Sequence, residues 1–387
     1  MHALMIGNNA HPECAEGVAR ITWETFRGLS SLMDVDLVSI IDPYFERTFN
    51  MKILENASDA IEMGHAHFLF KKSGLIGEKE VFMKIIEQIR KINKVHSIDI
   101  IHLHNLGPFS SLLIKTLVKK PILFQTYSLP RSLRSKMAIK VMDGITSLAP
   151  EMRNYIIANL HLNSNKVYLT HVPIDSSHFK PMNTADARKY FNLPPEKFII
   201  LYLGNPFIDR LPPQTFKIIK RIIEKGNRDI LFLVAIPAYS TSTYIIQRFY
   251  ENIRKFKLEN NMKIIVRIID YRFRPLIYNA ANLIIHPYLW EEVPYPFLTV
   301  LEAMSCGKPV IVSAARCYTH IVIDAYNGFL FRPRKFNEFE RKLLYVVANK
   351  GNLHTLGLNA RDTITSFFSY EKVAKEIMTV YEDVLRK

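Results

Sequence analysis

This 387-residue sequence has few cysteines and no long apolar run. Its three cysteines, Cys14, Cys306 and Cys317, form no Cys-x-x-Cys pair, which excludes a disulfide framework and a cysteine-rich zinc site and favours a reducing cytoplasm. Gly7 interrupts the first apolar run after about four residues, and later runs such as 198–202 and 230–236 have only strand length. We therefore expect no signal segment and no membrane-spanning helix, so any contact with a membrane is peripheral.

Acidic side chains are outnumbered, with 36 Asp and Glu against 51 Lys and Arg, a formal net charge of +15. Residues 1–50 carry 3 basic and 7 acidic side chains, whereas residues 101–150 carry 7 basic and 1 acidic. These seven cations lie between Lys115 and Lys140, among apolar segments rather than in a terminal tail. The surplus indicates an anionic partner: nucleic acid, a membrane surface or a phosphorylated substrate. A solvated basic face without a specific partner is the alternative.

The order of apolar segments predicts two α/β domains. An apolar fraction of 48% with 22% charged residues excludes disorder as the main state. In both halves, apolar segments of strand length alternate with segments of helical spacing, which indicates parallel sheets covered on both faces. Prolines cluster at 173–195 and predict a linker at 176–196, between domains at 1–175 and 197–370. We expect two Rossmann-like domains facing each other across a cleft, with ligands at the carboxyl ends of the strands. Residues 42–76 are expected to be irregular.

Two places in the first half carry candidate binding residues. Gly17 opens a predicted helix with Arg20 one turn later, a pattern that lets backbone N–H groups approach a phosphate, although a plain loop glycine explains it as well. The G-x-G-x-x-G signature is absent, which argues against a nicotinamide enzyme. His102 and His104 end a predicted strand and point to one face of it. With no third ligand at motif spacing, hydrogen bonding to a sugar or phosphate is favoured over a metal.

The second half carries further candidates after its strands. Arg210 follows the predicted loop of Gly204 and Asn205 and could hold a diphosphate through bidentate hydrogen bonds. Glu292 and Glu302 follow the strand at 283–286, where carboxylates could accept hydrogen bonds from ribose hydroxyls. A favourable interaction with a helix N-terminus is the alternative reading of Glu292, which precedes the predicted helix that contains Glu302.

The sharpest segment is residues 301–312, LEAMSCGKPVIV, in which Gly307 ends a predicted helix and Pro309 prevents its continuation. At this string the sequence resembles the family-4 retaining glycosyltransferases of GT-B architecture, and the likeness spans nearly the whole chain. The family stretch reads Glu, seven residues, Glu-Ala-Met-Ala-Cys-Gly-Lys-Pro-Val, and residues 302–310 match its second part with one change. Supporting segments occur in the family order: Gly17 with Arg20, residues 99–104 (DIIHLH), Asp175 with Phe179 and Pro181, Gly204 with Arg210, residues 277–286 (IYNAANLIIH) and residues 324–330 (DAYNGFL).

Three departures from the family pattern fall at the expected donor site. Pro294 occupies the position of the first Glu of the pair. Tyr127 occupies the position of a strand-end His that is expected to touch the reacting sugar. Arg316, Cys317 and His320 replace a Gly-Gly-x-x-Glu segment whose backbone meets the diphosphate. These changes indicate either an unusual donor or reduced activity.

The resemblance implies a transferase that moves a sugar, with retention, from a nucleotide-diphospho-sugar to a polysaccharide, lipid-linked or small-molecule acceptor, without a metal or another cofactor. It implies an acceptor-binding first domain, a donor-binding second domain and a last helix, 371–387, that returns to the first domain. The implied catalytic residues are Arg210, as the principal cation at the leaving diphosphate, and Tyr127 and His104, which line the sugar site. The implied donor-binding residues are Gly204, Asn205, Arg210, Glu292, Glu302, Arg316 and Lys308, and Gly17 and Arg20 form the implied acceptor or phosphate loop.

Two other function classes remain as alternatives. The departures favour a degenerate nucleotide-sugar-binding subunit without activity, and the net charge alone favours a nucleic-acid-binding protein, which we rank last because no nucleic-acid motif is present. The cations Arg131, Arg134, Lys136 and Lys140 follow Tyr127 closely. Because of these cations, our preferred partner hypothesis is peripheral contact with the inner face of an anionic membrane, or contact with a phosphorylated or lipid-linked acceptor.

Overall fold

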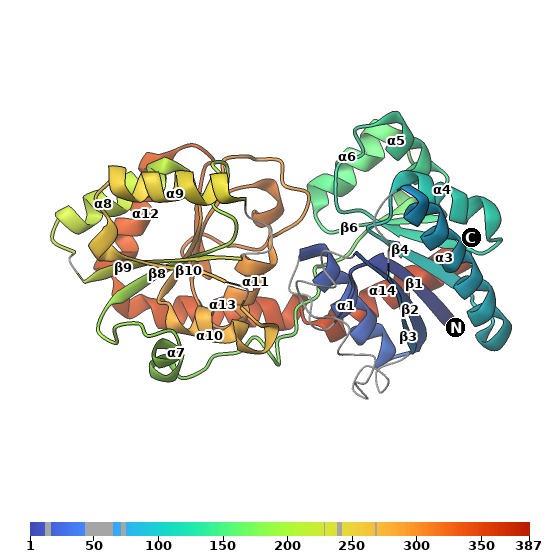
Figure 1. Ribbon diagram of the computed structural model, residues 1–387, viewed down its shortest axis with the longest axis horizontal. Coiled ribbons are helices and arrows are strands. Elements are labelled where there is room, and N and C mark those ends of the chain that lie inside the picture. The colour runs from blue at the N-terminus through green and yellow to red at the C-terminus, as the bar shows by residue number, and fades with distance from the viewer. Residues whose placement is uncertain (12–16, 43–64, 71–74, 228, 238–241, 268) are drawn as a thin grey trace. The chain divides into compact units, whose positions relative to one another are not determined.

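The computed structural model describes the whole chain except residues 12–16, 43–64, 71–74, 228, 238–241 and 268. Two compact units make up the described residues (Figure 1). Unit 1 comprises Met1–Pro173 and Phe367–Lys387, and unit 2 comprises Ile174–Ser366. The segment predicted as a linker, 176–196, is therefore part of unit 2.

Unit 1 contains, among its described residues, a parallel sheet of seven strands in the order β3-β2-β1-β4-β5-β6-β7. Its strands are β1 (His2–Asn8), β2 (Asp34–Ile41), β3 (His65–Phe70), β4 (Ile100–His104), β5 (Ile122–Gln125), β6 (Gly144–Ser147) and β7 (Val167–Leu169). The predicted irregular region 42–76 lies partly outside the described residues, but it contains strand β3, so that prediction was wrong there. The segment HAHFLF was too short and too rich in histidine to be recognised as a strand.

The helices of unit 1 are α1 (Gly17–Ser30), α3 (Leu75–His96), α4 (Pro108–Leu117), α5 (Leu133–Lys140), α6 (Pro150–Leu160) and α14 (Tyr370–Leu385). From β1 the chain crosses through α1 to β2 in one direction along the sheet, and from β4 it crosses through α4 to β5 in the other. Because such crossovers are right-handed, α4 and α5 cover the face opposite to α1 (Figure 1).

The face beneath α1 is closed by the last helix of the chain. Trp23, Phe26 and Leu29 of α1 form a buried cluster with strand residues and with α14. Its α14 members are Val373, Ala374, Ile377, Val380, Tyr381 and Val384. Gly28 permits this close approach, because a Cβ there would meet the Tyr370 carbonyl oxygen at 2.6 Å. The predicted return of the last helix to the first domain is confirmed.

Unit 2 contains, in its described part, a parallel sheet of six strands in the order β10-β9-β8-β11-β12-β13. Its strands are β8 (Phe198–Leu203), β9 (Ile230–Ile236), β10 (Met262–Val266), β11 (Leu283–His286), β12 (Val310–Ser313) and β13 (Gly328–Phe331). Its helices are α7 (Thr184–Tyr190), α8 (Pro213–Glu224), α9 (Thr243–Lys255), α10 (Arg274–Ala280), α11 (Leu298–Ser305), α12 (Phe336–Ala348) and α13 (Leu353–Phe367). The predicted fold class of two Rossmann-like parallel sheets is confirmed.

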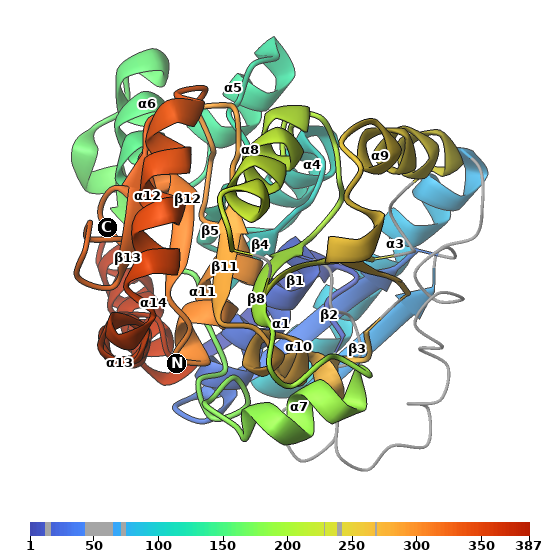
Figure 2. The same ribbon diagram turned by 90° about the vertical axis from the view of Figure 1, so that its left-hand side faces the viewer.

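The elements of unit 2 pack through one large apolar cluster. Strands β8, β9 and β11 contribute buried Ile, Leu, Val, Phe and Tyr side chains, and α8 and α12, which lie side by side in Figure 2, cover them. The predicted joint at Gly307 is present, with Gly307 at φ +70° between α11 and β12. Helix α7 packs on α10, where the Arg188 guanidinium bonds the Ala280 carbonyl and the Asn282 side chain. These contacts explain why the proline-rich segment is not a free linker.

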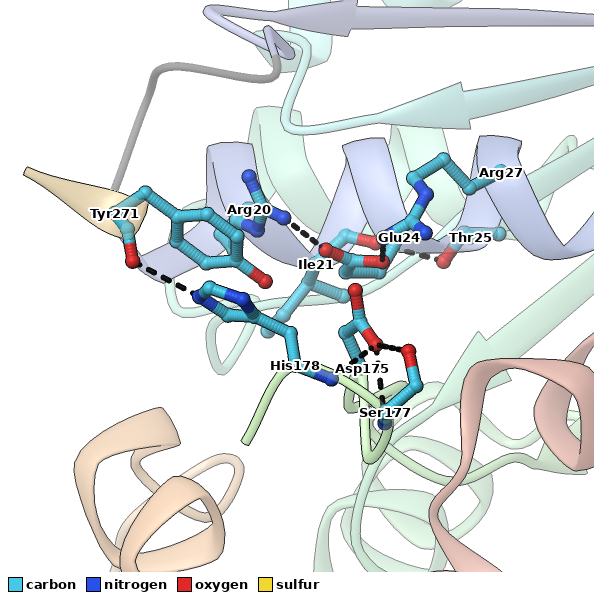
Figure 3. Close-up of polar contacts among 9 residues, drawn as sticks. All are labelled: Arg20, Ile21, Glu24, Thr25, Arg27, Asp175, Ser177, His178 and Tyr271. Carbon is cyan, nitrogen blue, oxygen red and sulfur yellow. Dashed lines mark hydrogen bonds and ion pairs between the residues drawn. The ribbon is translucent and has the colours of Figure 1, made fainter. Parts of the chain in front are cut away.

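A turn at the start of unit 2 is fixed by Asp175 (Figure 3). Its Oδ1 accepts hydrogen bonds from the Ser177 N–H, the Ser177 hydroxyl and the His178 N–H. The His178 ring lies 4.4 Å from the Tyr271 ring, and its Nε2 is 2.9 Å from the Tyr271 carbonyl oxygen. These contacts give Asp175, which matches the family pattern, a structural role in fixing this turn.

Candidate functional site

The carboxyl end of β8 carries the first candidate residues of unit 2. Gly204 follows this strand at φ +148°, a conformation that glycine adopts without strain, and its N–H donates to the Ala235 carbonyl. The buried Tyr202 hydroxyl donates to the Asn205 carbonyl at 2.7 Å. A tight turn then brings Arg210 back, with its N–H bonded to the Phe207 carbonyl. Hydrogen bonds to backbone groups therefore fix the loop. They do not use the Arg210 side chain, which makes other contacts.

The guanidinium of Arg210 lies over aromatic rings. Its Cζ is 5.3 Å from the centroids of both Phe207 and Phe297. Phe297 is the N-cap of α11 and provides no side-chain cap, so the positive end of this helix lies beside the cation. A positive side chain next to the N-terminus of a helix is suited to binding an anion.

His286, at the end of β11, stays neutral beside this cation. Its ring is 4.7 Å from the Phe297 ring. Burial, and secondly the charge of Arg210, lower the pKa of His286 to about 3. The positive charge at this edge therefore resides on the arginine. The sequence analysis did not single out His286. The sequence feature that could have identified it is a polar residue at the end of a buried strand.

The loops after β8, β11 and β12 are joined to one another. The Asp209 carbonyl accepts from the Leu289 N–H at 2.8 Å, and its carboxylate accepts from the Trp290 indole at 3.2 Å. The Glu291 carbonyl accepts from the Arg316 N–H at 3.0 Å. The side chains of Glu292 and Arg316 are exposed on these loops. The structure thus brings Gly204, Asn205, Arg210, Glu292 and Arg316 to the same edge of the sheet of unit 2.

Glu302 has partners inside unit 2. Its carboxylate accepts a 2.5 Å hydrogen bond from the Tyr278 hydroxyl and lies 3.2 Å from Arg274 Nε, and its residue is 1% exposed. These contacts tie α11 to α10. Both contacts fall on Oε2, and the predicted contact of Glu302 with a ribose hydroxyl stays a prediction.

Lys308 does not lie with the donor candidates. It precedes β12, at the amino end of the strand, and its Nζ donates to the Asn279 carbonyl at 3.2 Å. Burial lowers the pKa of Lys308 to about 8. Ligands of such sheets generally bind at the opposite edge, the carboxyl ends of the strands, and the donor contact of Lys308 stays a prediction.

In unit 1, His104 and Tyr127 are brought together. His104 Nδ1 is 2.8 Å from the Tyr127 hydroxyl, and His102 Nδ1 is 2.9 Å from the Tyr381 hydroxyl. Burial lowers the pKa of both histidines, that of His104 to about 3, so both are neutral. His104 is completely buried, and its predicted contact with the reacting sugar stays a prediction. It positions Tyr127, which lines a pocket of about 90 Å³ together with Asn105, Ser128 and Ser135.

Arg20 is engaged within α1 (Figure 3). Its guanidinium pairs with Glu24, and Glu24 also lies 2.9 Å from Arg27. Arg20 and Glu24 are both buried. Gly17 is the first residue of the helix, and residues 12–16 of the predicted glycine loop lie outside the described residues. The phosphate or acceptor role of Gly17 and Arg20 stays a prediction.

Comparison with known proteins decides the family. Residues 183–363 match the family model described as glycosyl transferases group 1. Residues 183–363 of the chain thus belong to this family. The resemblance on residues 302–310 is thereby confirmed.

Individual relatives are distant. The UDP-Gal:alpha-D-GlcNAc-diphosphoundecaprenol alpha-1,3-galactosyltransferase of Escherichia coli is 26% identical over 64% of this chain and 62% of its own length. The capsular polysaccharide biosynthesis glycosyltransferase CapM of Staphylococcus aureus is 23% identical over 66% of this chain and 65% of its own. The chain therefore matches less than two thirds of the length of these curated relatives.

Solved structures share the fold of this chain over nearly its full length. Sucrose-phosphate synthase from Thermosynechococcus elongatus has a TM-score of 0.76 at 19% identity and covers 100% of this chain and 99% of its own. Anabaena HepE in complex with UDP-glucose has a TM-score of 0.74 at 14% identity and covers 99% of both chains. At these identities the likeness establishes the GT-B fold. No helix in the described part of the chain is long and apolar enough to cross a bilayer.

Proposed function

We propose that this protein is a retaining glycosyltransferase that transfers a sugar from a nucleotide-diphospho-sugar. The observation that carries the proposal is Arg210, a cation stacked on Phe207 and Phe297 beside the start of α11. When the glycosidic bond of the donor breaks, negative charge grows on the leaving diphosphate. Fixed positive groups aimed at that charge stabilise the transition state more than the ground state.

Each group at this edge has a distinct part in the proposal. Arg210 donates bidentate hydrogen bonds to phosphate oxygens, and the first N–H groups of α11 add the positive end of the helix. His286 remains neutral, so it does not repel the arginine or add a titrating charge. Arg316, exposed on the adjoining loop, supplies a second cation where the family has glycines.

We infer a uridine nucleotide donor and a lipid-linked acceptor. The Escherichia coli relative uses UDP-Gal with a sugar on diphosphoundecaprenol, and HepE binds UDP-glucose. In unit 1, the pocket beside Tyr127 and the nearby cations Arg131 and Arg134 suit an acceptor that combines a sugar with a diphosphate.

The test compares UDP with uridine by isothermal titration calorimetry. Arg210→Ala should weaken UDP binding by roughly tenfold or more and leave uridine binding unchanged, because only UDP carries the phosphates. Arg341→Ala, at an exposed arginine of α12, is the matched control. Equal UDP affinity in wild type and Arg210→Ala would refute the assignment of the diphosphate to Arg210.

A degenerate binding subunit is the second candidate, favoured by Pro294 and Tyr127 at positions where the family has Glu and His. Transfer and hydrolysis of a panel of UDP-sugars in the presence of a polyprenyl-diphosphate sugar separate the two. Release of UDP that is lost in Arg210→Ala supports the enzyme. Tight UDP binding with no release from any donor supports the subunit.

A further inference from the structure

Helices α4 and α5 leave apolar side chains on the surface of unit 1. On α4, Phe109 is 70% and Leu117 57% exposed, with the half-buried Leu113 between them. On α5, Leu133 is 73% and Met137 53% exposed. Each set recurs every four residues, so it forms a stripe along the outer side of its helix. The two helices pack against each other, in the upper right of Figure 1.

The α5 stripe extends to Val141, which directly follows the helix and is 44% exposed. At 100° per residue, Arg134 lies on one side of the line through Leu133 and Met137, and Lys136 and Lys140 lie on the other. The inner side of the helix is formed by the buried Ala138 and Ile139. An apolar centre with cations on both sides is typical of a helix that lies in a membrane interface.

The charge around the stripes has one sign. Neither α4 nor α5 contains an acidic residue. Residues 101–150 contain a single acidic residue, Asp143, which lies 2.5 Å from Lys115. The cations around the stripes are Arg131, Arg134, Lys136, Lys140, Lys119 and Lys120. This combination attracts an anionic surface and offers it apolar side chains.

We propose that the α4–α5 face, made of these two stripes and six cations, docks the protein on an anionic lipid bilayer. Leu133, Met137 and Phe109 enter the boundary between headgroups and acyl chains, and Arg134 and Lys140 contact lipid phosphates. The long stems of the cations extend along the apolar stripe while their charges reach the headgroups. The sequence had pointed only to the cations; the exposed stripes add a contact that salt does not screen.

A bilayer fits this face better than a nucleic acid does. Nucleic acid would engage the cations and could stack a base on Phe109, but it gains nothing from the exposed Leu, Met and Val side chains that make up the rest of the stripes and lack a flat ring. The inference goes beyond the proposed transfer reaction and does not depend on it. Its test therefore uses binding and not activity.

The experiment is co-sedimentation of the full chain with vesicles of phosphatidylcholine alone or with phosphatidylglycerol. Wild type should bind only the anionic vesicles. Leu133→Ser with Met137→Ser should lower the partition coefficient by about tenfold per side chain, and Arg134→Gln with Lys140→Gln by about fivefold per charge. Leu358→Ser, at a leucine of α13 that is 54% exposed, and Lys217→Gln with Lys263→Gln are matched controls in unit 2 and should bind as wild type.

Fluorescence distinguishes insertion from surface attraction. Leu133→Trp should shift its emission to the blue on anionic vesicles, and Leu358→Trp should not. Wild-type binding by the Leu133/Met137 variant, or an unchanged Leu133→Trp spectrum on vesicles that bind the protein, would overturn the insertion. Absence of vesicle binding, with salt-dependent binding to RNA or DNA instead, would overturn the proposal as a whole.

Discussion

Removing the charge of Glu302 should destabilise unit 2 strongly. In Glu302→Gln, the amide oxygen can still accept from Tyr278, but Arg274 loses its carboxylate in a site where the glutamate is 1% and the arginine 8% exposed. Breaking a buried ion pair on one side costs about 3–5 kcal/mol. Because the Tyr278 hydrogen bond is retained, we expect about 3 kcal/mol, the lower end of this range.

The assay is urea unfolding of the full chain, followed by circular dichroism. Asp229→Asn, which breaks the exposed pair with Lys350, is the control and should cost less than about 1 kcal/mol. A Glu302→Gln loss as small as that of the control would refute the structural role. If stability were retained while UDP affinity fell, Glu302 would instead serve the ribose, as the family resemblance implied.

Two further perturbations test the cores of the units. Gly28→Ala places a Cβ 2.6 Å from the Tyr370 carbonyl oxygen and should cost about 1–3 kcal/mol of unfolding free energy, whereas Gly351→Ala, at a site with no atom within 4 Å of the added Cβ, should cost far less in the same urea titration. Burial holds the pKa of His104 and His286 at about 3. Between about pH 6.5 and 3 the unfolded chain binds protons at these rings that the folded chain does not, so stability should fall as the pH falls through this window. In His286→Phe, stability should fall less steeply in this pH window, and above pH 6.5 the difference in unfolding free energy between variant and wild type should stay constant. An unchanged pH dependence would contradict the buried neutral histidine.

Apart from a few elements, β3 and α7 among them, the order of strands and helices followed from the sequence, as did the joint at Gly307 and the returning last helix, because each depends on local pattern or on the family resemblance. The partners of single side chains did not follow. His102 and His104 were correctly placed on one face of a strand, but the helix that closes this face, with Tyr381, lies far along the chain. Similarly, the motif placed Glu302 on a helix without indicating that Tyr278 and Arg274 occupy its carboxylate. Lys308 matched the family string, yet only the sheet topology revealed that it stands at the amino end of β12.

The position of α14 has a consequence for the order in which the chain folds on the ribosome. Trp23 and Phe26 emerge early, but the side chains that cover them, from Val373 to Val384, are translated last. Unit 2 is complete in sequence before then, so it can fold while the first sheet still exposes one apolar face. A chain shortened to end at Ser366 and released from the ribosome should therefore hold a protease-resistant second unit and a first unit that recruits chaperones.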